Sequence, residues 1–154
     1  MNRHKYFASI TKEALEDMLN DCVSRYPEEA CGMLGGIYES ESRSWIVQSA
    51  IPIANVHPTP GTAFAFDPAS WIKHYFGMTN NRQQFAGIYH SHPSAPPVPS
   101  VKDETGFAFS QPELNYWIIS FPSDPRAGRS HNLPLVQPYR FADNAFYPVP
   151  LIIA

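Results

Sequence analysis

The segment from His90 to Asp103 carries the residue types best suited to chemistry. It reads His90-Ser91-His92, continues through a proline-rich stretch, and ends in Ser100-Val101-Lys102-Asp103. Alternate residues of a strand point to the same face, so a strand that ends at His92 places both imidazoles on one side. Two histidines and one carboxylate form a catalytic zinc ligand set that leaves a fourth position for water. The segment therefore predicts a metal site.

Each half of this segment also has a simpler interpretation. Ser100 and Asp103 fit a capping box, in which a serine and an acid only begin a helix. A histidine pair can be a satisfied polar pair at the end of a sheet. The stiff proline-rich loop, however, returns Ser100 and Asp103 toward the histidines at a nearly fixed distance. The four positions together would match by chance in about one sequence in a thousand, which favours the metal.

The same spacing resembles that of a known family. His90-x-His92, seven residues, Ser100, two residues and Asp103 resemble the JAMM motif of the MPN-plus zinc metallopeptidases. Upstream, the segment 27–36 resembles the one that carries the family's catalytic glutamate. There the glutamate stands two residues before the cysteine of a Cys-Gly pair, which selects Glu29 over Glu28. The resemblance runs from about residue 7 to residue 121.

This resemblance implies a mechanism. One Zn²⁺ per chain would be bound by His90, His92 and Asp103 and would activate a water molecule. Glu29 would act as general base and then deliver the proton to the departing amine. The Ser100 hydroxyl would donate a hydrogen bond to the developing oxyanion.

The resemblance also implies a substrate class. The short chain is similar to the stand-alone bacterial members, which resemble processing proteases for ubiquitin-like sulfur-carrier proteins. We therefore expect a peptidase or isopeptidase that cleaves an amide bond at a C-terminal Gly-Gly tail. A small-molecule amidase with the same zinc site and a non-catalytic MPN interaction scaffold remain alternatives. A zinc deaminase is disfavoured, because its His-x-Glu and Pro-Cys-x-x-Cys elements are absent from the sequence.

Length and composition predict one globular domain over residues 1–154. The formal net charge is −3 and no run of Lys or Arg occurs, so we expect no nucleic-acid partner. The apolar stretches are too short and interrupted for a membrane span. Two cysteines make no disulfide framework, and both are interpreted as small buried hydrophobes. A cytoplasmic enzyme is expected, with its oligomeric state left open.

Periodicity and capping signals predict the elements that position these residues. Helices are expected from Thr11 to about Tyr26, from the Asp67-Pro68 cap to about Met78, and over 100–110. Strands are expected at 32–39, 44–53, 64–66, 85–92 and 114–121, with two or three more between 133 and 153. The class is therefore α/β or α+β. The family resemblance implies a curved, mostly antiparallel sheet in a deaminase-like architecture, with the first helix on one side and the second on the other.

Overall fold

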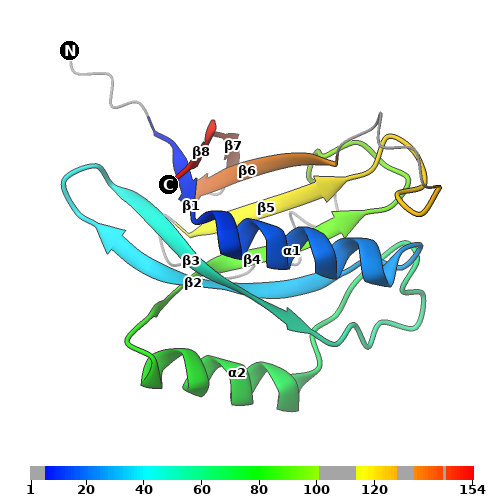
Figure 1. The fold of residues 1–154 in the computed structure, drawn as a ribbon, viewed down its shortest axis with the longest axis horizontal. Helices are drawn as coiled ribbons and strands as arrows, with labels where there is room; N and C mark the ends of the chain where they lie inside the picture. Colours follow the sequence, from blue (N-terminus) through cyan, green and yellow to red (C-terminus); the bar gives the residue numbers. More distant parts are fainter. Residues whose placement is uncertain (1–5, 101–113, 128–133, 144) are drawn as a thin grey trace.

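A computed structural model describes residues 6–100, 114–127, 134–143 and 145–154. Within these ranges two helices flank one eight-stranded sheet (Figure 1). The elements follow one another as β1 (Ala8–Ile10), α1 (Lys12–Arg25), β2 (Cys31–Glu39), β3 (Ser44–Ile53), α2 (Pro68–Asn80), β4 (Gln84–His92), β5 (Asn115–Ser120), β6 (Leu135–Ala142), β7 (Ala145–Pro148) and β8 (Leu151–Ile153). The α+β class is confirmed, and so are the strands expected in the tail.

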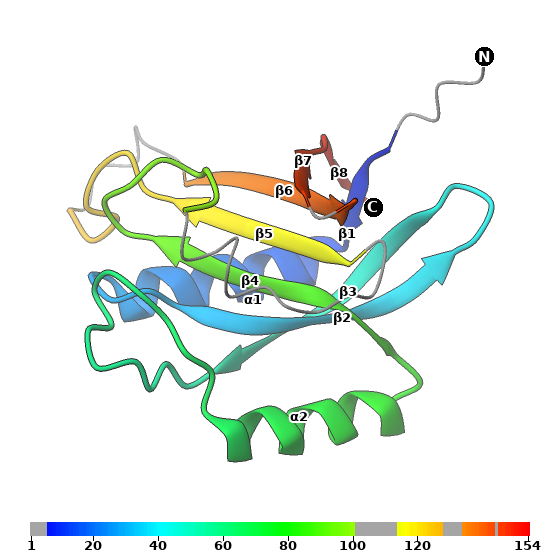
Figure 2. The same ribbon diagram turned by 180° about the vertical axis from the view of Figure 1, so that it is seen from behind.

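The sheet is mixed and twisted, with the strand order β7-β6-β5-β4-β2-β3-β1-β8. Strands β2–β3, β2–β4, β5–β6 and β6–β7 pair in antiparallel fashion. Strand β1 pairs in parallel with β3 and β8, and β4 pairs in parallel with β5. The expectation of a mostly antiparallel sheet therefore holds for the larger share of these pairs. The strand that bears both histidines, β4, lies in the interior of the sheet between β2 and β5, as both views show (Figures 1 and 2).

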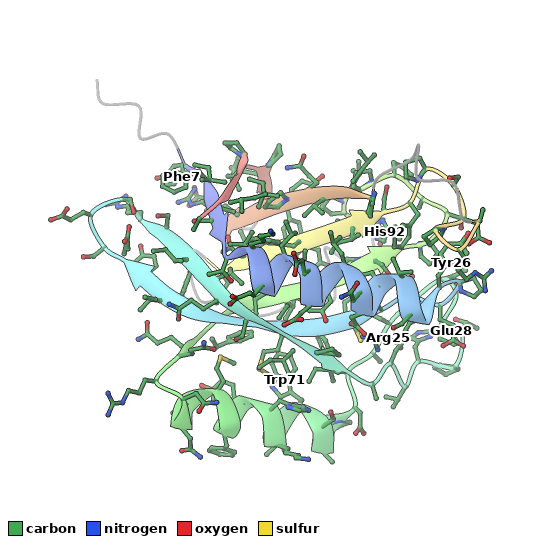
Figure 3. The ribbon with its side chains drawn as sticks, viewed as in Figure 1. Phe7, Arg25, Tyr26, Glu28, Trp71 and His92 are labelled. Carbon is green, nitrogen blue, oxygen red and sulfur yellow. The ribbon has the colours of Figure 1, made fainter. Side chains whose placement is uncertain are left out.

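The two helices cover opposite faces of the sheet. Thr11 is the N-cap of helix α1, and its side chain accepts a hydrogen bond from the Ala14 amide. Met18 and Cys22 of this helix pack in one core with Tyr89 and Trp117. Asp67 is the N-cap of helix α2, which buries fewer of its residues against the sheet than α1 does. Its Trp71 points from the helix toward the sheet (Figure 3) and joins a second cluster on the other face, with Ile88 and Tyr116. This arrangement confirms the expected placement of the helices.

The structure differs from the expected elements at residues 64–66. Residues 64–66 do not form the predicted strand, because only Phe66 makes a bridge, opposite Asn55. The neighbouring backbone groups of Ala63 and Ala65 bond instead to the Asn55 side chain, so no ladder extends there. The helix predicted over 100–110 lies outside the described residues, apart from its first position. Among the residues described, no helix is long and apolar enough to cross a membrane.

Candidate metal centre

The C-terminal end of β4 holds the two predicted histidine ligands. His90 is fully buried and His92 is 7% exposed, and β4 ends at His92, before Pro93. As the alternation of a strand requires, Tyr89 and Ser91 point to the other face. The Tyr89 hydroxyl donates to Asp21 of α1, and the Ser91 hydroxyl accepts from the Ala30 amide. The expectation that both imidazoles share one face is confirmed.

The two imidazoles face each other directly. His90 Nε2 and His92 Nε2 lie 2.8 Å apart, and the role of each nitrogen depends on the tautomer of its ring. His92 Nδ1 lies 2.9 Å from the Pro96 carbonyl oxygen, which can only accept. This contact favours the neutral tautomer of His92 that is protonated at Nδ1, which leaves a lone pair at Nε2 on the side of His90. A backbone carbonyl that orients a histidine in this way is common behind metal ligands.

Glu29 completes a buried group of three potential ligands. Its side chain is 7% exposed, and its Oε1 lies 4.0 Å from His90 Nε2. One ligand atom from each of Glu29, His90 and His92 lies within 4.8 Å of the others. Two imidazole nitrogens and a carboxylate oxygen in a buried position match the donor types of a zinc site. The neighbouring Glu28 is exposed, at the end of the molecule where α1 terminates (Figure 3).

Aromatic side chains enclose the histidines. The Phe64 ring stacks on His90 at a centroid distance of 4.6 Å and an interplanar angle of 29°. Tyr116 of β5 meets the same imidazole edge-on at 5.3 Å. Tyr139 of β6 donates a hydrogen bond to the carbonyl of Pro97, next to the Pro96 carbonyl that holds His92. Such walls lower the local dielectric constant, which strengthens electrostatic interactions inside the site.

The structure describes four of the five predicted site residues. It brings together Glu29, His90 and His92. Ser100 is exposed in the loop after β4, and Asp103 lies outside the described residues. The individual roles of all five therefore stay predictions. Sequence reasoning gave Phe64 no role at the histidines, because no spacing in the sequence signals its contact with a residue 26 positions later.

Comparison with known proteins places this chain in a family. Residues 11–131 match the family described as prokaryotic homologs of the JAB domain. The solved structure of protein DSY2949 from Desulfitobacterium hafniense is similar, with a TM-score of 0.77, 28% identity, and coverage of 96% of this chain and 93% of that one. A protein from Salinibacter ruber, 19% identical, shares the fold with a TM-score of 0.67 over 95% of this chain and 91% of its own.

Three relatives carry names that describe an activity. A probable TtuB-protein conjugate cleaving protease of Thermus thermophilus is 31% identical over 100 residues, which cover 65% of this chain and 63% of the relative. The desampylase of Haloferax volcanii is 36% identical over 77 residues, 50% of this chain and 52% of the relative. The matches thus span less than two thirds of those two proteins. A CysO-cysteine peptidase of Mycobacterium tuberculosis is 28% identical over 146 residues, 95% of this chain and 90% of the relative. On the family match over 11–131, this chain belongs to the prokaryotic homologs of the JAB domain.

Proposed function

We propose that this protein is a zinc-dependent peptidase or isopeptidase. Its substrate would be an amide bond at the C-terminal Gly-Gly tail of a ubiquitin-like or sulfur-carrier protein. The observation that carries the proposal is the buried group of Glu29, His90 and His92 at the end of β4. The names of the Thermus, Haloferax and Mycobacterium relatives support the reaction and the substrate class.

The proposal gives each site residue one role. His90, His92 and Asp103 would hold one Zn²⁺, which when bound would supply Lewis acidity and lower the pKa of its water toward about 7. Glu29 accepts a proton from the attacking water and passes it to the departing amine. The Ser100 hydroxyl donates a hydrogen bond to the oxyanion. The buried setting of Glu29 and of both imidazoles supports this assignment, because it keeps bulk water away from the proton transfer.

We propose the cytoplasm as the compartment, with all of residues 1–154 acting as one domain. Both cysteines, Cys22 and Cys31, are buried free thiols, which suits a reducing environment. The partner would present an extended tail of small residues, since extended peptides bind through their main chain while pockets select the side chains.

Zinc content and cleavage of a model conjugate test the proposal together. The probe is a ubiquitin-like protein whose Gly-Gly tail is joined by an amide bond to a reporter peptide. We expect about one zinc per chain by elemental analysis and cleavage directly after the second glycine. The matched probe carries Val-Val in place of Gly-Gly and should not be cleaved. His90→Ala should lose most of the zinc and the activity.

Each alternative function gives a different result. Equal rates on the Gly-Gly and Val-Val probes, together with hydrolysis of small amides, would favour a small-molecule amidase. Full zinc occupancy with no cleavage of any amide would favour a non-catalytic scaffold. Zinc content unchanged in His90→Ala, His92→Ala and Asp103→Ala alike would contradict the site itself.

A further inference from the structure

The backbone of Glu29 and Ala30 is held at every polar group. The Glu29 amide donates to the Pro60 carbonyl at 2.7 Å, and the Glu29 carbonyl accepts from Asn55 Nδ2 at 3.0 Å. The Ala30 amide donates to Ser91 Oγ at 2.8 Å, and the Ala30 carbonyl accepts from the Ser91 amide at 2.9 Å. Two of these four partners are side-chain atoms, Asn55 Nδ2 and Ser91 Oγ. Of these two, Asn55 Nδ2 is the one that bonds to Glu29.

The Asn55 side chain uses its whole hydrogen-bonding capacity. Nδ2 donates to the carbonyls of Glu29 and Ala63, at 3.0 and 3.1 Å. Oδ1 accepts from the amides of His57 and Ala65, both at 3.0 Å. These four partners select one orientation of the Asn55 amide group. A flipped group would direct its oxygen at two carbonyls and its NH₂ at two backbone amides.

The same amide also holds the aromatic wall of the site. Ala63 and Ala65, two of its partners, flank Phe64, and the Phe64 ring stacks on His90. Pro60, which accepts from the Glu29 amide, lies in the same loop, between Asn55 and Ala63. One side chain therefore connects the carboxylate-bearing segment with the wall that covers a histidine.

We propose that Asn55 is a positioning residue, which sets the Glu29 carboxylate and the Phe64 ring relative to His90. The inference deepens the proposed function and rests on it for its consequence in catalysis. Asn55 touches neither the histidines nor the Glu29 carboxylate in the described contacts, so it acts through the backbone. Misplacement of a general base by about 1 Å costs on the order of 100-fold in rate, whereas substrate affinity depends on other contacts.

Two substitutions of Asn55 separate the parts of this role. Asn55→Ala removes all four hydrogen bonds. Asn55→Asp keeps the two bonds that Oδ1 accepts, but it places a second oxygen against the carbonyls of Glu29 and Ala63. Thr11→Ala is the matched control, because it removes one capping bond of α1 and lies outside the site. Zinc content, kcat and KM are measured on the Gly-Gly conjugate, and hydrogen exchange of the Glu29 amide is measured on the zinc-loaded protein without substrate.

We expect both Asn55 variants to retain zinc and to lose about 10- to 100-fold in kcat, with KM within about twofold. Protection of the Glu29 amide should fall about tenfold or more, since the loop that holds Pro60 opens more often. Thr11→Ala should change neither kcat nor the protection of the Glu29 amide. Wild-type protection of that amide in both Asn55 variants, or lower protection with an unchanged kcat, would overturn the inference. If the wild-type protein cleaves no conjugate, the proposed function fails, and the exchange rates alone decide whether Asn55 holds Glu29.

Discussion

Two adjacent carboxylates, Glu28 and Glu29, lie in opposite environments just before β2. The Glu28 side chain is exposed, and its amide donates to the carbonyl of Arg25 at the end of α1. The Glu29 side chain is buried near His90. A buried carboxylate without a function is expensive, because its charge loses the solvation of water. The difference in burial therefore makes the two residues a natural pair for mutagenesis.

Substitution of each glutamate by glutamine should separate base from ligand. Glu29→Gln keeps the size and the hydrogen-bonding capacity of the side chain but cannot take up a proton. We expect it to fold, to retain zinc, and to lose about 10²–10⁴-fold in kcat. Glu28→Gln should keep activity within a few-fold of the parent. Both rates on the Gly-Gly conjugate and both zinc contents are measured in parallel.

The possible results identify any error in this assignment. An inactive Glu28→Gln beside an active Glu29→Gln would mean that the wrong carboxylate has been chosen. Loss of zinc from Glu29→Gln would make Glu29 a ligand rather than the base. Full activity in both variants would contradict the mechanism.

At the scale of the elements, the parallel pairing of β4 with β5 depends on Gly87. This residue has a φ of +148°, which side chains rarely tolerate, and a Cβ there would overlap the backbone carbonyl of Asn115 in β5. Gly87 lies three residues before His90 on the same strand. The close contact between β4 and β5 at Gly87 therefore lies N-terminal to the two histidines on β4.

Two glycine-to-alanine substitutions test this dependence. Gly87→Ala should destabilise the protein by roughly 2–4 kcal/mol, from backbone strain and displacement of β5. The matched control is Gly77→Ala in α2, where a Cβ meets no atom within 4 Å. Since alanine favours helix, Gly77→Ala should stabilise by about 0.5–1 kcal/mol. Urea unfolding measures both, and equal stability of the two variants would contradict the role given to Gly87.

At the scale of the whole molecule, the interface between α1 and the sheet buries groups that must stay neutral. Burial, helped by the charge of Asp21, raises the pKa of Tyr89 far above its usual value. Burial likewise raises the pKa of Cys31 to about 11 and that of Cys22 further still. In the unfolded chain the two thiols ionise from about pH 8.5 and Tyr89 from about pH 10, whereas in the folded chain their raised pKa values keep these three groups neutral there. The stability that these groups contribute is complete below those values and is lost as the pH rises.

We therefore expect the free energy of unfolding to fall between pH 8 and pH 11. Tyr89→Phe removes one such group, so above pH 10 its slope should be shallower by about 1.4 kcal/mol per pH unit. Thr11→Ala removes no titrating group, so it should lower the free energy of unfolding at every pH without changing its slope against pH. Urea unfolding at several pH values measures the slopes. Parallel curves for the wild type and Tyr89→Phe would contradict the explanation.

Local signals in the sequence were enough to predict most elements and part of the site. The caps at Thr11 and Asp67 and the apolar periodicity after them correctly placed both described helices. Strand alternation and the proline after His92 correctly predicted that His90 and His92 share a face. These features depend on neighbours within a few residues, so the order of the residues determines them directly.

Only the tertiary structure decided what lies next to these elements. Glu29 reaches His90 because β2 pairs with β4, and Phe64 covers His90 because the Asn55 amide bonds on both sides of it. The strand expected at 64–66 was wrong for the same reason, since the side chain of Asn55, opposite Phe66, took bonds of Ala63 and Ala65 that a partner strand would have made. Contacts between residues 26 or 61 positions apart depend on strand order and register, which no local pattern specifies. The sequence by itself determined that the two histidines share one face, whereas the fold decided their surroundings.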